Sequence, residues 1–306
     1  MKNCMKWVLI ACLCLLTACG VPSGEKPQPL SDGTGPAVQA IDGAPDLAVP
    51  DSVGPGKPNP SLAEDETPTY ITCRIVDGAE DGSLLLAELD GGTGVFRLDN
   101  PDTAQITLDG QPIYASGLQD GMMVKIGFNG TILETFPAQL GAVYSIAAET
   151  ADGTCFDLCG LYLQVLDDLW QKDPALNENI SQIALDIANA PGGLTESEQA
   201  ALIWRFGELH GVEAFAATYE QLLEEGYITK PSPEEDGPFC AWEDGCFFSI
   251  KPNEGHEGEV YSLPAVFFDV QKWRSSLGAY YFYDCFAAWG ETGTWNGYTI
   301  GGEMIA

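Results

Sequence analysis

The 49 residues from Gly20 to Pro68 contain no aromatic side chain, and ten of them are proline and seven are glycine. The few apolar residues of this stretch show little helical or strand periodicity. A segment of this composition buries too little apolar surface to offset the entropy lost on ordering. We therefore expect residues 19–68 to form a disordered tether, so that any folded structure is built from residues 69–306.

A short apolar segment precedes the tether. Lys2 and Lys6 lead into the ten apolar residues Trp7–Leu16, whereas a helix that spans a bilayer needs about 20. A charged start, a short apolar core and small residues before a cleavage point are typical of an export signal. Residues 1–18 are therefore predicted to be a signal peptide.

The predicted signal ends in Leu16-Thr17-Ala18-Cys19, which resembles the lipobox of bacterial lipoproteins. The resemblance implies that Cys19 is lipidated and becomes the first residue of the mature protein, and two or more acyl chains hold a protein stably at a membrane. It further implies a membrane-anchored lipoprotein on the outer side of a bacterial plasma membrane, or in a periplasm; the resemblance described below favours a Gram-positive bacterium. The alternative is an ordinary secretory signal in which Cys19 is incidental.

The chain is strongly acidic, with a net charge of -32 at pH 7. Such a surface repels phosphate backbones and anionic lipid head groups. Nucleic acid is therefore excluded as a partner. Cationic partners fit this charge, and so does an acidic surface that is simply solvated.

Six cysteines lie beyond Cys19, and six thiols allow 15 pairings among which the sequence does not choose. An exported chain permits disulfides, but the spacings do not form a compact disulfide scaffold or the paired Cys motifs of a zinc site. We expect buried free thiols, with disulfides and then zinc as alternatives, at Cys73, Cys155, Cys159, Cys240, Cys246 and Cys285.

Residues 69–149 are predicted to be a small antiparallel β-barrel. Glycine- and aspartate-rich turns separate short apolar runs with β character, which are Tyr70–Val76, Ser83–Leu89, Val95–Leu98, Met122–Phe128 and Tyr144–Ala148. About five strands without a long helix favour an OB-like barrel.

A hairpin is predicted at Asn129-Gly130, because both residues tolerate the positive φ angles of a type I′ turn. The turn would pair Met122–Phe128 with Thr131–Phe136 and place Lys125 opposite Glu134. One face of the hairpin would then carry Val124, Ile126, Phe128 and Leu133.

The same region contains Asp120-Gly121, Val124-Lys125-Ile126, Asn129-Gly130, Ile132 and Glu134–Gln139. In these residues it resembles a small OB-like domain of unknown function found in lipoproteins of Gram-positive bacteria. That family carries no known activity, so the resemblance implies only a fold. OB-like domains bind oligomers with aromatic and basic side chains, and the scarcity of cations here favours a spacer over a ligand-binding role.

Residues 150–306 are predicted to be a separate α+β domain. Apolar residues at helical spacing predict a helix over Phe156–Lys172. Thr195-Glu196-Ser197-Glu198 is a capping box for a second helix that ends at Gly211, and Thr218 begins a short third helix that ends at Gly226. The predicted strands are Ile183–Ile187, Cys246–Ile250, Val260–Val270, Ala279–Ala288 and Trp295–Ile300.

No catalytic, cofactor or metal motif is present in the sequence. His210 lies at a helix end, where a cation suits the dipole, and His256 lies in an acidic loop. The region from Tyr280 to Tyr298 is rich in aromatic residues, and strand alternation would project Tyr281 and Tyr283 from one face. Exposed tyrosines bind sugars or peptides, whereas buried ones belong to a core.

These observations favour a non-catalytic lipoprotein, tethered to the membrane through Cys19, that binds an envelope protein, a peptide or a glycan. The alternatives are an extracytoplasmic hydrolase that uses acidic residues of the C-terminal domain and, third, a purely structural envelope protein. Two cleft carboxylates about 5 to 10 Å apart would favour the hydrolase. A shallow aromatic face without such a pair would favour binding.

Overall fold

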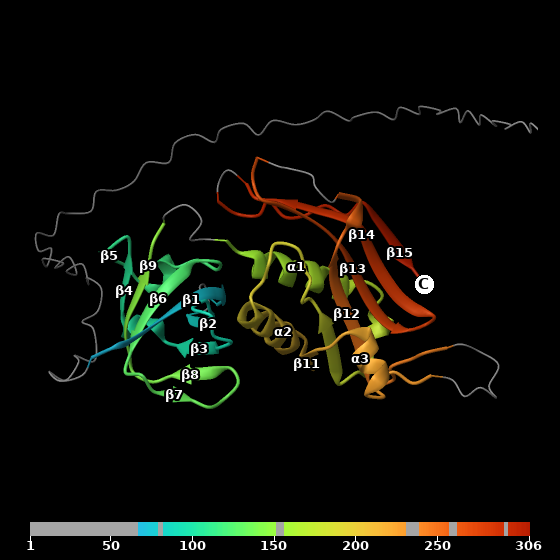
Figure 1. Ribbon diagram of the computed structural model, residues 1–306, viewed down its shortest axis with the longest axis horizontal. Helices are drawn as coiled ribbons and strands as arrows, with labels where there is room; N and C mark the ends of the chain where they lie inside the picture. Colours follow the sequence, from blue (N-terminus) through green and yellow to red (C-terminus); the bar gives the residue numbers. More distant parts are fainter. Residues whose placement is uncertain (1–66, 79–81, 151–155, 231–238, 257–261, 291–292) are drawn as a thin grey trace, which may run out of the picture. The chain divides into compact units, whose positions relative to one another are not determined.

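The computed structural model describes residues 67–78, 82–150, 156–230, 239–256, 262–290 and 293–306 (Figure 1). The predicted signal peptide, Cys19, Cys155 and nearly all of the predicted tether lie outside these residues. Within them the chain is a mixed α+β structure with two sheets. No helix in this part of the chain is long and apolar enough to cross a membrane.

The first sheet has nine strands in the order β5-β4-β9-β6-β1-β2-β3-β8-β7. The β3–β8 and β4–β9 pairs are parallel and the other pairs are antiparallel. The strands are β1 (Thr69–Asp77), β2 (Ser83–Glu88), β3 (Val95–Asp99), β4 (Gln105–Leu108), β5 (Gln111–Pro112), β6 (Met123–Phe128), β7 (Ile132–Leu133), β8 (Ala138–Leu140) and β9 (Val143–Ala148), with 3-10 turns η1 (Pro101–Thr103) and η2 (Ala115–Gly117).

The predicted barrel is wrong, because this sheet is not closed. The edge strands are β5 and β7, and no ladder among the described residues joins them. The predicted strands at β1, β2, β3, β6 and β9 are confirmed, since their alternating apolar side chains fill one core. Closure needs partners for both edges, and these two-residue edge strands are too short to supply a ladder.

The predicted hairpin at Asn129-Gly130 is also wrong. The strand β6 lies between β1 and β9, so both of its hydrogen-bonding edges are occupied. A strand has only two such edges, and β7 therefore pairs with β8 instead. The predicted inward face is confirmed for Val124, Ile126 and Phe128, which are buried, whereas Leu133 is exposed.

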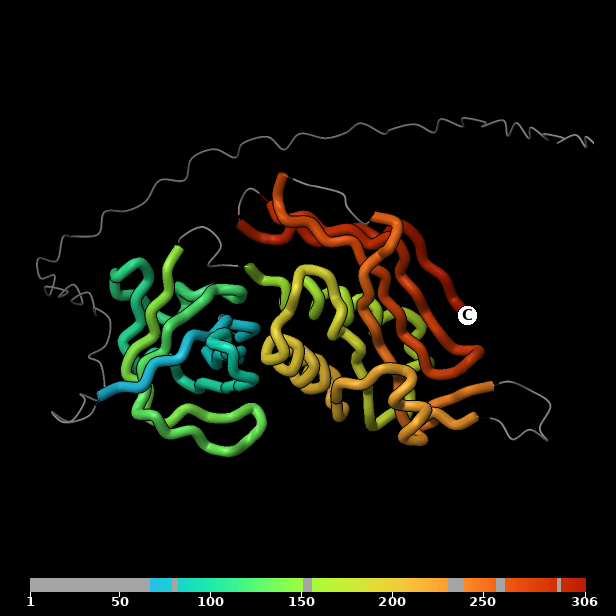
Figure 2. The backbone as a smooth tube through the Cα atoms, viewed as in Figure 1, coloured from blue at the N-terminus to red at the C-terminus, as the bar shows by residue number. Residues whose placement is uncertain are grey.

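The second sheet has six strands in the order β11-β10-β12-β13-β14-β15, in which β10 is parallel to β11 and β12 and the other pairs are antiparallel. The C-terminal strand is the edge strand beside β14 (Figure 2). The strands are β10 (Gln182–Asp186), β11 (Glu213–Ala216), β12 (Gly245–Pro252), β13 (Ala265–Ser275), β14 (Gly278–Ala288) and β15 (Gly302–Ile305). The predicted strand Trp295–Ile300 is wrong, because it forms only isolated bridges at Trp295 and Thr299.

The predicted helices are confirmed, and their caps define where they begin. The side chain of Asp157 caps the first helix by accepting from the Gly160 amide, and complete capping boxes begin the other two at Thr195 and Thr218. The helices are α1 (Leu158–Gln171), α2 (Glu196–His210) and α3 (Tyr219–Glu224), with 3-10 turns η3 (Pro174–Asn177) and η4 (Glu254–His256).

The helices cover the two faces of the second sheet unequally. One face packs against α1 and α2 through residues such as Phe248, Phe268 and Phe282. On the opposite face α3 covers only part of the sheet, around Phe247 and Trp273. The remainder of that face carries the site described below.

A buried lysine closes the C-terminal end of α1. The Nζ of Lys272, on β13, donates to the carbonyl oxygens of Trp170 (3.0 Å), Lys172 (2.7 Å) and Asp173 (3.3 Å). The side chain is fully buried, and this burial lowers the pKa of Lys272 to about 8. One donor thus binds three carbonyl groups at and just beyond the end of the helix, where backbone carbonyls lack intrahelical partners.

A buried contact joins the two sheets. In β2, Leu84 and Leu86 face the core of the first sheet, while the alternate residues Leu85 and Ala87 join the core that contains α1 and α2. Arg74 on β1 pairs with Glu198 on α2, with 2.7 Å between Nε and Oε1. Strand alternation thus explains why the run Leu84–Ala87 is apolar throughout.

Candidate ligand-binding site

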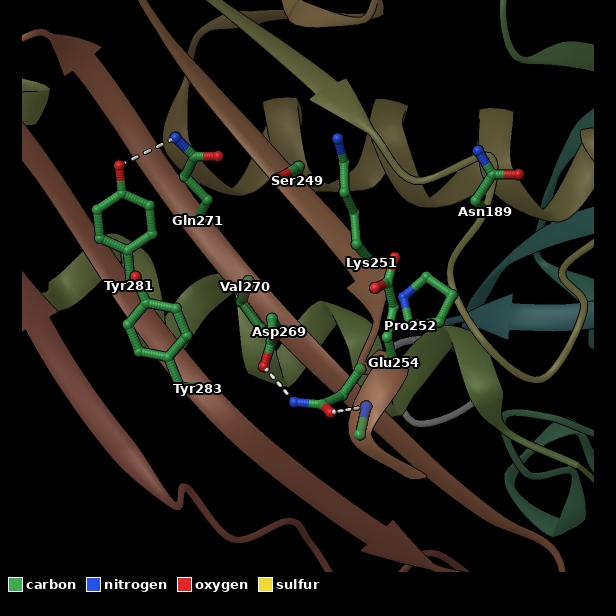
Figure 3. Close-up of a pocket in the computed structure, with 12 residues that line it drawn as sticks. Asn189, Ser249, Lys251, Pro252, Glu254, Asp269, Val270, Gln271, Tyr281 and Tyr283 are labelled. Carbon is green, nitrogen blue, oxygen red and sulfur yellow. Dashed lines mark hydrogen bonds between the residues drawn. The ribbon is translucent and has the colours of Figure 1, made fainter. Parts of the chain in front are cut away.

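The open part of the second sheet forms a trough of about 750 Å³. Because Val266, Phe268 and Val270 face the helices, the alternate residues Asp269 and Gln271 of β13 face the trough. The trough runs between β14 on one side and the end of β12 with η4 on the other (Figure 3). Its lining residues are Asn189, Ser249, Lys251, Pro252, Asn253, Glu254, Gly255, Asp269, Val270, Gln271, Tyr281 and Tyr283.

One wall of the trough consists of two stacked tyrosines. The rings of Tyr281 and Tyr283 lie 5.6 Å apart between centroids and 10° from parallel. The Nε2 of Gln271 donates to the Tyr281 hydroxyl over 3.3 Å (Figure 3). The predicted alternation is confirmed, because Phe282 between them is fully buried in the opposite core. Two aromatic side chains are thereby held half-exposed beside polar groups.

The opposite wall is polar and charged. Lys251 of β12 extends across from the tyrosines (Figure 3), and its Nζ lies 3.3 Å from Oδ2 of the nearly buried Asp186. Asn189, in the loop that follows β10, adds an amide group. The parallel strands β10 and β12 end side by side here, and ligands of mixed sheets bind at such carboxyl ends.

A bulge in β14 follows Tyr283 and lies beside Asp269, both of which line the trough. The β13–β14 register shifts between Phe268 and Val270, and Asp284 has a left-handed φ of 51°. This conformation aims the Asp284 amide at Oδ1 of Asp269 (2.9 Å). The Nδ2 of Asn253 donates both to that oxygen (3.0 Å) and to Oδ1 of Asp284 (2.8 Å). One amide group therefore bridges two carboxylates.

The described cysteines hold free thiols and lie apart from the trough. Burial raises the pKa of Cys246 and of Cys285 to about 12, and burial also raises the pKa of Cys73 and of Cys159. Such thiols are protonated at neutral pH and are poor nucleophiles. Cys240 is half-buried, and no cluster of three or more potential metal-ligating side chains occurs among the described residues.

The two histidines pack on aromatic rings and do not line the trough. His210 ends α2 as predicted, stacks on Trp170 at 4.0 Å and has its pKa lowered by burial. His256 stacks on Phe267 at 4.0 Å.

The sequence marked Tyr281 and Tyr283 but missed the polar side of the trough. The alternation of Asp269 and Gln271 with apolar residues in β13 could have predicted that these two polar side chains share a face of the sheet. Lys251 and Asn189 gave no signal, because their proximity depends on the parallel pairing of β10 with β12. Comparison of the chain with protein-family models, with curated proteins and with solved structures finds no match.

Proposed function

We propose that the chain is an extracytoplasmic lipoprotein, anchored through Cys19 to the plasma membrane of a Gram-positive bacterium, that binds an envelope saccharide in the trough. The anchor is supported by the sequence Leu16–Cys19 and by the tether-like composition of residues 19–68. In this proposal residues 69–149, which form the open first sheet, serve as a spacer, and the saccharide-binding residues lie in the second sheet.

The combination of stacked tyrosines with polar side chains carries this proposal. Sugars present apolar C–H faces beside many hydroxyl groups, so they suit an aromatic wall flanked by hydrogen-bonding groups. The trough offers a wall formed by Tyr281 and Tyr283, and facing groups of both donor and acceptor type on Lys251, Gln271 and Asp269. Its mixed lining suits a hydroxyl-rich ligand better than a purely apolar one.

The hydrolase alternative rests on Asp269 and Glu254, which line the trough, and on Asp284, which lies next to Asp269 at the bulge. Asp269 and Asp284 accept from the same Nδ2 of Asn253, and Asp269 also accepts a backbone amide. A general acid and its partner need carboxylates that face the reacting bond, whereas Oδ1 of Asp269 and Oδ1 of Asp284 are occupied in holding the bulge. Binding is therefore the proposed function.

The test is a titration of the full chain, carrying Cys19→Ala, with glucan-type and chitin-type oligosaccharides, followed by nuclear magnetic resonance. We expect Tyr283→Ala to weaken binding about tenfold, because an aromatic contact of roughly 1.4 kcal/mol is lost. The matched control is Leu277→Ala, which removes a 71% exposed side chain outside the trough.

Unchanged affinity in folded Tyr283→Ala, or the absence of binding to any oligosaccharide, would overturn the saccharide proposal. Release of shorter saccharides that stops in Asp269→Asn would favour the hydrolase instead.

A further inference from the structure

A second cavity of about 420 Å³ lies near the N-terminal end of α1. The turn before β6 contributes one part of its wall, and the segment after β14 contributes another. The cavity shares no residue with the trough. It is lined by Leu118, Gln119, Asp120, Asp157, Gly160, Leu161, Gln164, Trp289, Gly293, Thr294 and Trp295.

Two indole rings form an aromatic corner of this cavity. A β-bridge joins Trp289 to Trp295, and their rings are 5.2 Å apart and 83° from parallel. Phe156 packs against both rings, at 4.9 Å and 5.2 Å. The two ring planes thus lie nearly at right angles, and both side chains line the cavity.

The charge in the cavity is negative. Asp120 and Asp157 line it, and none of its described lining residues is lysine, arginine or histidine. Asp157 is only partly exposed, and its Oδ1 accepts from the Gly160 amide over 2.8 Å. Burial raises the pKa of Asp157 to about 6, with Asp120 and Asp77 adding to this shift and Arg74 opposing it.

One donor of the aromatic corner has no hydrogen-bond partner among the described residues. The Nε1 of Trp295 is buried and finds no acceptor among the described residues. A buried donor without a partner is costly. The cavity therefore combines aromatic side chains with a largely buried carboxylate, and the Trp295 N–H group lies beneath its surface.

We propose that this cavity binds a small organic cation, a quaternary or alkylated ammonium. Aromatic rings attract such cations through their quadrupole, and Asp157 supplies the counter-charge. A divalent metal ion fits less well, because it prefers several oxygen ligands and the indole rings offer none. This site is independent of the saccharide proposal.

The decisive comparison uses choline and 3,3-dimethylbutan-1-ol, which has the same shape without the charge. Both are titrated into the full chain carrying Cys19→Ala, and the indole N–H resonances of Trp289 and Trp295 report binding. We expect choline to bind about tenfold more tightly than the alcohol at pH 7.5. Equal affinities would show a merely apolar cavity and would overturn the proposal, as would the absence of choline binding to the folded protein.

Variants identify the groups responsible. We expect Asp157→Asn to weaken choline binding about fivefold to tenfold while leaving the alcohol unaffected, and Trp295→Leu to weaken it more than about tenfold. Trp295→Phe keeps an aromatic ring with a weaker quadrupole. Its choline affinity is therefore expected to lie between that of the unsubstituted chain and that of Trp295→Leu. The exposed residues Glu134 and Phe136 provide the matched controls Glu134→Gln and Phe136→Leu. Unchanged choline affinity in folded Asp157→Asn and Trp295→Phe would place the cation elsewhere and contradict the assignment.

Discussion

Burial of the ionised carboxyl group of Asp157 lowers the stability of the folded protein at neutral pH. Its oxygens cap α1, but the group is largely removed from water, and its pKa rises from 3.8 to about 6 mainly because of that burial. Between these two values the folded chain binds more protons than the unfolded chain. The free energy of unfolding therefore falls as pH rises from about 4 to about 6. A costly charge retained beside two indoles is consistent with a binding role.

Replacing this carboxylate should stabilise the protein at neutral pH. Asn also caps helices, so Asp157→Asn keeps the contact to Gly160 and removes the buried charge. We expect a gain of about 1–2 kcal/mol at pH 7, discounted from the full pKa shift because solvent reaches the group. The gain should shrink toward zero near pH 4. Urea unfolding at pH 4, 5, 6 and 7 measures it.

Asp109 provides a control, because its pKa is shifted in the opposite direction from that of Asp157. Hydrogen bonds from Thr150 lower the pKa of Asp109. Its contribution is therefore present above its unfolded pKa and is lost as pH falls. Asp109→Asn should destabilise at pH 7, with an effect that fades in acid. If Asp157→Asn also destabilised the protein at pH 7 with an effect that fades in acid, burial would not be the dominant influence on the pKa of Asp157.

At the scale of elements, the start of α2 organises the contact between the sheets. Glu198 completes the capping box of α2 by accepting from the Thr195 amide over 2.8 Å. Its other oxygen accepts from Arg74 of β1 over 2.7 Å. The neighbouring Ser197 donates its hydroxyl to the Glu88 carbonyl of β2 over 2.5 Å. One helix end therefore satisfies its own amides and also binds two strands of the first sheet.

Breaking the Arg74–Glu198 pair should cost far more than breaking an exposed pair. The side chains are only 16% and 8% exposed, so Arg74→Met leaves a buried negative charge without its partner and should cost about 2–4 kcal/mol. Adding Glu198→Gln, which preserves the capping box, should restore about 1–2 kcal/mol. Urea unfolding of the two single variants and the double variant measures this coupling.

The exposed Arg97–Asp99 pair is the matched control. Its side chains are 46% and 52% exposed, so Arg97→Met should cost less than about 1 kcal/mol. Equal losses in Arg74→Met and Arg97→Met would show that the contact between the sheets does not depend on the buried pair.

Patterns among residues close together in the sequence predicted individual helices and strands better than they predicted which strands pair with each other. The capping box at Thr195 and the inward face of β6 depend on residues close together in the chain, and both are confirmed. The hairpin at Asn129-Gly130 failed because β1 and β9, which are distant in sequence, occupy both edges of β6. The same holds for the trough. Alternation within β14 predicted that Tyr281 and Tyr283 share one face, whereas Lys251 and Asn189 lie close together only because β12 pairs with β10.

At the scale of the molecule, the shared core predicts that the two sheets unfold together. Val76 and Leu85 of the first sheet belong to the same buried cluster as Leu166 and Phe206 of the helices. Gly121 allows a close approach at this contact, because a Cβ there would lie 2.5 Å from the Asp157 Cβ. Apolar burial across such a contact couples the two cores in one cooperative transition.

Tryptophan fluorescence can test this coupling, because every tryptophan of the described residues lies between Trp170 and Trp295, beyond the first sheet. Ile126 is fully buried in the first core alone, and Ile126→Ala should cost about 2–5 kcal/mol. We expect the urea midpoint to fall equally by fluorescence and by circular dichroism. The control Ile132→Ala, at a 46% exposed site in β7, should leave it nearly unchanged. A fluorescence midpoint that stays in place while the dichroism shifts would mean that the sheets unfold separately, and the shared core would then contribute little to the stability of either.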